Sequence, residues 1–349
     1  MRLNGVFSFF CSMKLFIFGL LIPAALHAQS YRGLAVLDDN SAWISGSEGH
    51  VLRTVNGGEC WDTLNPEGYE KKEFRDIHAW DANNALVMSS GEKAIVLRTR
   101  DGGVTWNTVF SSSREGVFLD ALTFQGKYGI MIGDPYKASD GKSLLFDIMV
   151  TRDSGDTWSS YYEEPGATPV HALDNEALYA ASGTNILLSF DSTNSKRPWF
   201  IYFVTGGGVM NRFMSGNNFV PVPIKAGQAC GIYSFCSNNW SEIVAVGGSY
   251  LQPDARDSVA AYLNTSHANW QWDLAKTQPG GYRSCVAVDE EGKTYVCTGT
   301  NGSDMSTDSG RNWKPLDIGG FNVCAFSKNH LWLAGDKGNW KRVSKSSLK

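Results

Sequence analysis

Three carboxylate side chains are the strongest candidates for chemistry in this sequence: Asp120, Asp134 and Glu176. Two carboxylates about 5–10 Å apart can hydrolyse a glycosidic bond, one as the acid and the other as the nucleophile or base. Arg75 or Arg283 could hold an acidic sugar beside them through bidentate hydrogen bonds. These residue types permit a glycoside hydrolase or lyase, and the spacing of the carboxylates in the fold decides whether that chemistry is possible.

A wider set of polar and aromatic residues is predicted to bind a ligand without catalysis. The set comprises Arg75, Asp76, Asp120, Tyr233, Tyr250, Tyr282, Arg283 and Asn301. Together with Glu176, several of them would form a mixed-charge pocket. The alternative is that the arginines and acids pair with one another and serve only the fold. The sequence leaves both interpretations open.

The remaining motifs exclude several other functions. There is no Cys-x-x-Cys pair and no His/Cys cluster at zinc spacing, so neither a metal nor a cofactor is expected. Residues 140–143 read Asp-Gly-Lys-Ser, but Tyr136 stands where a phosphate loop needs its first glycine. The chain has a formal net charge of −4 and no runs of Lys or Arg, so it lacks the basic patch that is typical of proteins that bind nucleic acid.

These residues must be positioned by a repeated element with the template [ST]-x-[DN]-x-G-x-x-W. Each copy lies between strand-like runs, where the Asp or Asn can accept turn N–H groups and the glycine can take a positive φ. The tryptophan is expected to pack into a seam with a neighbouring unit. The four copies span residues 54–61, 99–106, 151–158 and 306–313, and their Asp/Asn and Trp residues are Asn56, Trp61, Asp101, Trp106, Asp153, Trp158, Asp308 and Trp313.

The repeat predicts an all-β fold, a single seven-bladed β-propeller over residues 29–349 with four-stranded antiparallel blades. Seven blades would use about 46 residues each. The copies are expected at the turn between the third and fourth strand of a blade (the C–D turn). The predicted blades are 33–64, 74–110, 118–163, 176–224, 231–274, 282–316 and 321–343, with 29–31 as the fourth strand of the last.

The loops of such a blade divide between two rims of the ring. The turns between strands A and B share one rim with the C–D turns, while the B–C loops and the links between blades lie on the other. The B–C loops 133–143, 247–257 and 299–304 are long and varied. Because loops carry function on a rigid scaffold, the rim opposite the repeated turns is predicted to be the binding face.

The N-terminal residues 1–28 have the pattern of a secretory signal peptide. Lys14 precedes an apolar run over residues 15–26, and Ala28 is a small residue suited to cleavage. The true start could be Met13. The mature chain is therefore expected to be exported to the periplasm or outside the cell, soluble, monomeric and without stable membrane insertion.

Six cysteines follow the predicted signal peptide. Cys285 and Cys297 flank the turn at residues 289–293 and are equidistant from its centre. They could form a disulfide across a hairpin in an oxidising compartment, or remain two buried free thiols. Both possibilities are open at this stage.

The repeated template is the Asp-box, or bacterial neuraminidase repeat, of sialidase-like β-propellers. The chain resembles the plant photosystem II stability/assembly factor family, and this resemblance rests on residues 43–49, 74–76, 133–135, 180–185, 204–207, 247–250 and 299–304. It implies a propeller scaffold without established chemistry. No Arg-Ile-Pro precedes the first Asp-box, as an active sialidase would require.

Two functional hypotheses follow from these patterns. The first is an exported, non-enzymatic propeller that binds a protein or glycan partner on its loop-rich rim. The second is a sialidase-like glycoside hydrolase or lyase that uses the carboxylates Asp120, Glu176 and Asp134.

Overall fold

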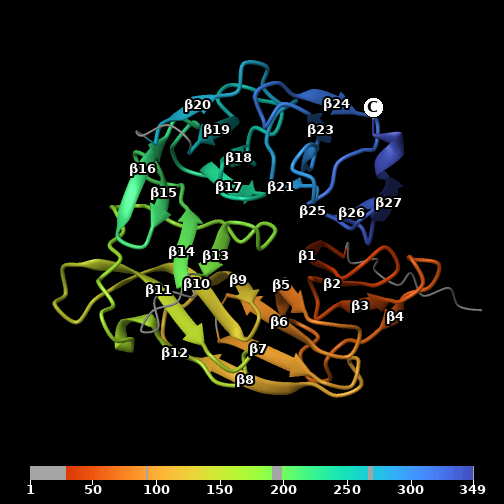
Figure 1. The fold of residues 1–349 in the computed structure, drawn as a ribbon. Coiled ribbons are helices and arrows are strands. Elements are labelled where there is room, and N and C mark those ends of the chain that lie inside the picture. Colours follow the sequence, from red (N-terminus) through yellow and green to blue (C-terminus); the bar gives the residue numbers. More distant parts are fainter. Residues whose placement is uncertain (1–28, 92, 191–198, 266–269, 349) are drawn as a thin grey trace, which may run out of the picture.

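The protein is a ring of seven antiparallel β-sheets around a central channel (Figure 1). This computed structural model describes residues 29–348 except 92, 191–198 and 266–269. The predicted seven-bladed, all-β propeller is confirmed. The predicted signal peptide, residues 1–28, lies outside the described residues. Within the described part of the chain, no helix is both long enough and apolar enough to cross a membrane.

Each blade is a meander whose strands follow the chain order from the channel outward. The strands of blades 1 to 4 are β1–β4 (Tyr31–Val36, Ala42–Gly46, Val51–Thr54, Asp62–Thr63), β5–β8 (Glu73–Ala79, Ala85–Ser90, Ala94–Thr99, Asn107–Ser112), β9–β12 (Leu119–Gln125, Tyr128–Lys137, Leu144–Thr151, Ser159–Ser160) and β13–β16 (Ile186–Phe190, Trp199–Val204, Asn211–Ser215, Asn218–Val222). Those of blades 5 to 7 are β17–β20 (Cys230–Ser237, Glu242–Ser249, Ala260–Asn264, Trp272–Leu274), β21–β24 (Cys285–Val288, Tyr295–Gly299, Gly302–Ser306, Lys314–Leu316) and β25–β27 (Val323–Phe326, His330–Ala334, Trp340–Ser344). Two 3-10 turns, η1 (Tyr161–Glu163) and η2 (Lys345–Ser347), complete the described elements.

The hydrophobic core lies in the seams between neighbouring blades. One cluster joins Leu86 and Met88 of blade 2 to Leu122 and Met131 of blade 3. Because a middle strand is covered by a blade on each side, all six residues of β6 are buried, whereas both residues of the outer strand β4 are exposed. The sequence therefore reads as apolar runs in the middle strands rather than as an alternating pattern.

The Asp-box turns are held by the same hydrogen bonds in each copy. In blade 2, Oδ1 of Asp101 accepts the N–H of Thr105 at 2.9 Å, and Oγ1 of Thr99 accepts the N–H of Gly103 at 2.8 Å. The N–H of Gly102 donates to the carbonyl of Asn83, which lies in the A–B turn of the same blade. The C–D and A–B turns therefore share one rim.

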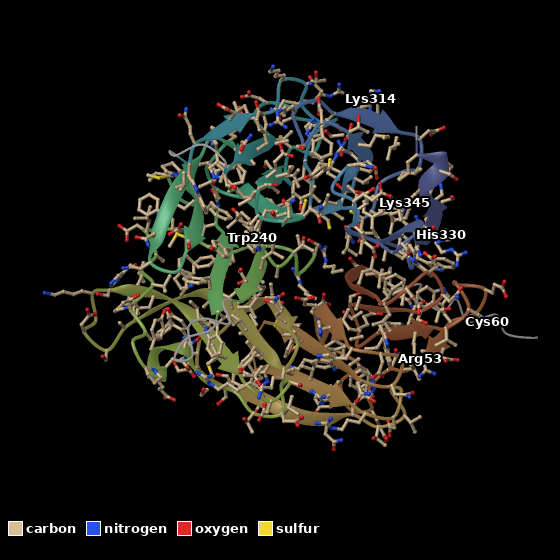
Figure 2. The ribbon with its side chains drawn as sticks, viewed as in Figure 1. Arg53, Cys60, Trp240, Lys314, His330 and Lys345 are labelled. Atoms are coloured by element: carbon tan, nitrogen blue, oxygen red, sulfur yellow. The ribbon has the colours of Figure 1, made fainter. Side chains whose placement is uncertain are left out.

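The Asp-box tryptophans contact the preceding blade. Trp106 lies edge-on to Trp43 of blade 1 and donates its indole N–H to the carbonyl of Leu64. Arg53, which Figure 2 labels, lies on strand C of blade 1. It donates to the carbonyl of Gly102 in the next Asp-box, and its guanidinium lies over the Trp43 ring. The seam between blades 1 and 2 is thus closed by an indole from one blade and an arginine from the other.

Two predicted blade boundaries differ from the structure. Blade 4 begins at β13, so Glu176 lies in the long link before that strand and not at its start. Residues 29–31 do not add a fourth strand to blade 7, whose described sheet has three. Instead, the N–H of Tyr31 donates to Gly335 in the loop between β26 and β27, at 3.1 Å. The two ends of the ring meet at this point because β1 continues directly from Tyr31 as the inner strand of blade 1.

The cysteines are free thiols in the described residues. Cys297 pairs with Val286 across the hairpin, while Cys285 pairs with Thr298. The offset of one residue turns the two side chains to opposite faces of the sheet, because side chains alternate along a strand. A disulfide between Cys285 and Cys297 is therefore excluded in this register.

Candidate functional site

A segment of the link between blades 3 and 4, residues 179–184, enters the centre of the ring (Figure 1), and we term it the channel plug. Ser182 donates to the carbonyl of Ser284 of blade 6 at 2.8 Å, and the hydroxyl of Thr184 lies 2.6 Å from that of Ser234 of blade 5. Gly183 lies against Asp76 of blade 2. The plug thus contacts inner strands on several sides of the ring.

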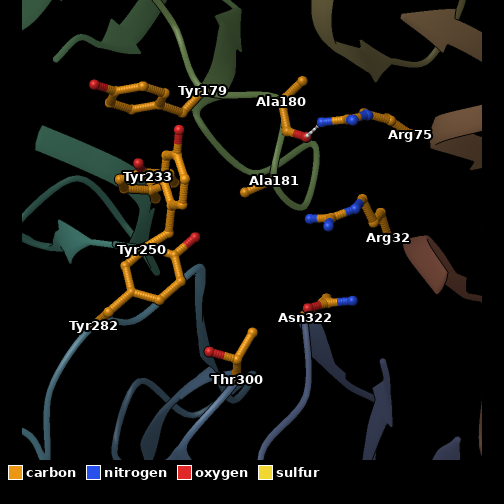
Figure 3. A pocket seen from close by; sticks show the side chains of 10 residues that line it. All are labelled: Arg32, Arg75, Tyr179, Ala180, Ala181, Tyr233, Tyr250, Tyr282, Thr300 and Asn322. Carbon is orange, nitrogen blue, oxygen red and sulfur yellow. Dashed lines mark hydrogen bonds between the residues drawn. The ribbon is translucent and has the colours of Figure 1, made fainter. Parts of the chain in front are cut away.

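A pocket of about 440 Å³ opens above the plug at the mouth of the channel (Figure 3). The plug supplies its floor and the starts of the inner strands supply most of its walls. Its lining residues are Arg32, Arg75, Tyr179, Ala180, Ala181, Tyr233, Tyr250, Tyr282, Thr300 and Asn322. None of these described lining residues is a carboxylate.

Two arginines form one wall of the pocket. Arg75 donates from Nη1 to the carbonyl of Ala180 at 3.1 Å, and Arg32 lies beside it (Figure 3). Among the described residues neither forms an ion pair. Burial, and then the charge of Arg32, lower the pKa of Arg75. The charges of Glu73 and Asp120 oppose this shift, although neither carboxylate forms an ion pair with Arg75 in the described structure. Two like charges without an ion-paired carboxylate at a half-buried site favour the approach of an anion.

Four tyrosines form the opposite wall (Figure 3). The rings of Tyr179 and Tyr233 are stacked with centroids 4.2 Å apart, and Tyr282 meets Tyr233 edge-on at 4.8 Å. Tyr250 is 53% exposed at the rim of the pocket. Burial raises the pKa of Tyr179 to about 12 and also raises the pKa values of Tyr233 and Tyr282, so these three phenols are neutral near pH 7. This wall offers flat apolar faces with hydroxyl groups at their edges.

Arg283 was predicted to bind a ligand, but the structure buries it in an ion pair. Its Nε donates to Oδ2 of Asp304 at 2.8 Å, its Nη1 donates to the carbonyl of Tyr282 and to Asn301 at 2.7 Å each, and it is 2% exposed. Asn301 is engaged in the same network, since its Nδ2 donates to the carbonyl of Pro253. Neither residue lines the pocket.

The strand register separates Arg32 and Arg75 from Arg283. In blade 6, Val286 pairs with Cys297, which pairs with Asp304. In blade 2, Ile77 pairs with Val87, which pairs with Leu97, so Arg75 corresponds to Ser284 and not to Arg283. Arg32 has the same place in blade 1, two residues before Leu34. Arg32 and Arg75 therefore lie at a different strand position from Arg283, the arginine that pairs with Asp304.

Two predicted acids lie behind the pocket instead of in it. Asp76 is 5% exposed and accepts the N–H groups of Ile77 and Leu122, and burial raises its pKa to about 7. Asp120 is fully buried, and its oxygens accept no well-formed hydrogen bond from the described residues, although the N–H groups of Ala180 and Asp134 are close. Burial and the nearby Asp134 raise the pKa of Asp120 well above its usual range.

The other two catalytic candidates line a separate hollow of about 720 Å³. Asp134 is half-buried, accepts the N–H of Leu178 at 3.1 Å, and has its pKa raised by burial to about 6. Glu176 is bound to Arg212, whose Nε lies 2.7 Å from Oε1 and whose Nη2 contacts Oε2. Thr205 also donates to Oε1, at 2.6 Å. The carboxylate of Glu176 is thus fully engaged within the fold.

The structure therefore brings together four of the predicted ligand residues, Arg75, Tyr233, Tyr250 and Tyr282. It also adds Arg32 and Tyr179, which the sequence analysis missed. A signal for Arg32 was present, because an aromatic residue followed by arginine opens three inner strands, at residues 31–32, 74–75 and 282–283. Tyr179 lies in the plug, and no sequence pattern marks that segment. No group of three or more His, Cys, Asp or Glu residues in the described structure is arranged to hold a metal ion.

Comparison with protein-family models and with curated proteins finds no match. Among solved structures, YCF48 bound to D1 peptide is similar at TM-score 0.59 and 14% identity, over 91% of this chain and 94% of that chain. YCF48 from Cyanidioschyzon merolae gives TM-score 0.58 and 17% identity, over 91% and 97%. The GH74 xyloglucanase from Xanthomonas campestris gives 0.60 and 14%, over 90% of this chain but 52% of the enzyme. Such low identities show the β-propeller fold alone.

Proposed function

We propose that this chain is an exported, non-enzymatic propeller that binds an acidic segment of a protein partner at the mouth of its channel. The observation that carries the proposal is the pocket of Figure 3, where the unpaired Arg32 and Arg75 face a wall of tyrosines. An arginine that has no carboxylate partner can form a bidentate pair with an incoming carboxylate.

A protein partner fits the pocket better than a neutral sugar chain would. The two adjacent positive charges gain most from an anionic ligand, and the tyrosine faces can pack against apolar side chains beside the acid. The similarity to YCF48 bound to D1 peptide supports a peptide ligand as well. An acidic glycan has comparable charge and remains the alternative ligand class that the experiment must distinguish.

Glycoside hydrolysis has less support, although a GH74 xyloglucanase shares the fold. The reaction needs two carboxylates that reach one sugar from an open pocket. Asp120 is fully buried, and Glu176 is bound to Arg212. Asp134 alone is half-buried, and it lines the other hollow. These three candidate carboxylates therefore do not form the required pair.

The test is direct binding of fluorescent peptides to the mature protein, measured by anisotropy. Matched acidic, neutral and basic peptides, each with the same aromatic and aliphatic residues, separate charge from apolar packing. We expect acidic peptides to bind, and Arg32→Ala and Arg75→Ala each to weaken them by about 10-fold to 100-fold, the range for a lost charged hydrogen bond. Raising the salt concentration should weaken binding further.

Arg100→Ala is the matched control, because Arg100 is exposed and pairs with Asp156 near the Asp-box rim. It should leave peptide affinity unchanged. If the protein selectively bound acidic glycans on an array, and the same two variants lost this binding, the ligand would be an acidic glycan and not a peptide. If the protein released sugar from glycosidase substrates, its function would be enzymatic and not binding alone. Binding that ignores both arginines would refute the assigned site.

A further inference from the structure

Two buried thiols face each other across the seam between blades 6 and 7. Cys285 opens β21 and Cys324 lies in β25, the neighbouring inner strand. Their Sγ atoms are 3.8 Å apart, and neither residue is more than 2% exposed. Among the six cysteines of the described residues, this is the one pair whose sulfur atoms are in contact.

The surroundings of Cys285 are unusually polar for a core thiol. Its Sγ accepts the N–H of Cys324 at 3.3 Å and the hydroxyl of Thr184 at 3.6 Å. Thr184 belongs to the channel plug and is itself held by Ser182 and Ser234. Hydrogen bonds to a sulfur favour its thiolate form, which is the form that attacks disulfides.

The two thiols differ in their readiness to react. Burial alone would raise the pKa of Cys285, but the hydrogen bonds from Cys324 and Thr184 outweigh it and lower that pKa to about 7. The hydrogen bond to Cys285, and then burial, raise the pKa of Cys324 well above its usual range. In the closed ring Cys285 is therefore the more readily ionised of the two thiols.

We propose that Cys285 and Cys324 form a disulfide when this chain folds in an oxidising compartment, linking the inner strands of blades 6 and 7. The sulfur atoms must approach from 3.8 Å to about 2.05 Å, which side-chain rotation on two adjacent strands can supply. This site is separate from the proposed peptide pocket, and the inference rests on the proposed export of the chain but not on peptide binding.

The reaction uses a disulfide oxidant, either a thiol–disulfide oxidoreductase or a small-molecule disulfide. The thiolate of one cysteine of the pair attacks one sulfur of the oxidant, which releases its other sulfur as a thiolate. The other cysteine then loses its proton to solvent and attacks the Sγ of the first, which forms the intramolecular bond and releases the second thiolate. Two electrons pass from the two cysteines to the oxidant. Because both thiols are buried in the closed ring, this exchange precedes the closure of blades 6 and 7.

The bond would strengthen the least complete part of the ring. In the described residues blade 7 has three strands, and its contacts to blade 1 include the hydrogen bond from Tyr31 to Gly335. A disulfide closing a loop of about 40 residues restricts the unfolded chain, with an expected rise in Tm of about 5 °C for a domain of this size.

The experiment compares mature protein refolded with oxidised glutathione and with dithiothreitol. Each sample is unfolded, free thiols are alkylated, and a non-reducing digest is analysed by mass spectrometry. We expect a cross-linked peptide pair containing Cys285 and Cys324 in the oxidised sample, and a Tm about 5 °C above that of the reduced sample. Cys324→Ser should abolish the difference in Tm.

Cys297→Ser is the matched control, because Cys297 is a buried thiol of the same blade whose side chain lies on the other face of the sheet. It should retain both the cross-link and the difference in Tm. The proposal is overturned if the oxidised wild-type protein has Cys285 and Cys324 fully alkylated, or if Cys285 is linked to another cysteine. The digest of wild-type protein decides this even if a variant fails to fold.

Discussion

Replacing Arg283 by alanine tests whether this arginine serves the fold or the ligand. In the native protein it donates to Asp304, to the carbonyl of Tyr282 and to Asn301. The side chains of Arg283 and Asp304 are 2% and 3% exposed. After the substitution, the remaining donor to the Asp304 carboxylate is the N–H of Gly280, at 3.2 Å from each oxygen. A buried negative charge would then lack its counter-charge.

The expected cost is large because it comes from the charge left behind. Removing one partner of a buried ion pair lowers the free energy of unfolding by about 3–5 kcal/mol. A domain is typically stable by about 5–15 kcal/mol, so Arg283→Ala should shift the unfolding midpoint strongly. Adding Asp304→Asn removes the lone charge, and the double variant should recover about 2 kcal/mol of the loss.

Equilibrium unfolding in urea, followed by tryptophan fluorescence, measures this effect, and peptide anisotropy measures binding by the folded fraction. We expect Arg283→Ala to lose stability and keep its affinity. Arg32→Ala should do the reverse, losing affinity while unfolding near the wild-type midpoint. The reasoning is refuted if Arg283→Ala unfolds like wild type, or if it loses peptide binding without losing stability.

Three further predictions concern the channel and the seams. Because burial raises the folded pKa of Asp76 to about 7, the stabilising contribution of this carboxyl is present at low pH and is lost as the pH rises through 7. The free energy of unfolding should therefore fall by about 1 kcal/mol between pH 6.5 and 8, and it should fall by less in Asp76→Asn. Urea titration at each pH measures this change. Trp313→Ala should lower the free energy of unfolding by about 3–5 kcal/mol, because Trp313 is 3% exposed. Trp106→Ala should lower it by less, because Trp106 is half-buried. If both variants melted at the same temperature as the wild-type protein, the seam packing would be contradicted. Gly183→Ala should lower Tm and weaken peptide binding together. The new Cβ would lie 2.3 Å from the Asp76 carboxylate, and the residue has a φ of +69°, which favours glycine. Unchanged Tm and unchanged affinity would show that the plug does not support the pocket.

The blade architecture could be predicted because its signals are local. The four Asp-boxes mark the C–D turn of blades 1, 2, 3 and 6, and each is complete within eight residues, so the hydrogen bonds that define the turn are encoded in one short segment. Once these turns are placed, the strands on either side follow in order. Arg75, on an inner strand, and Tyr282, just before one, both line the pocket at the channel mouth.

The plug and the partners of the charged residues could not be predicted, because they depend on contacts between distant segments. Glu176, in the link before blade 4, pairs with Arg212 on strand β15, and Ser182 reaches Ser284 across the channel. The pairing of the cysteines could not be predicted either, because it depends on the strand register and on the packing between blades. A hairpin offset of one residue separates Cys285 from Cys297, and the packing of a different blade places Cys324 beside Cys285 instead.

The arginines of this chain differ in whether a carboxylate is within hydrogen-bonding distance. Arg283 and Arg212 each form an ion pair with a buried carboxylate, that of Asp304 and that of Glu176, which compensates the charge within the fold. Arg32 and Arg75 form no ion pair among the described residues. Burial, and then the charge of Arg32, lower the pKa of Arg75, and the charges of Glu73 and Asp120 oppose this shift. An incoming carboxylate would supply the direct hydrogen bonds that these two acids do not make, and this is the physical basis of the proposed anionic ligand.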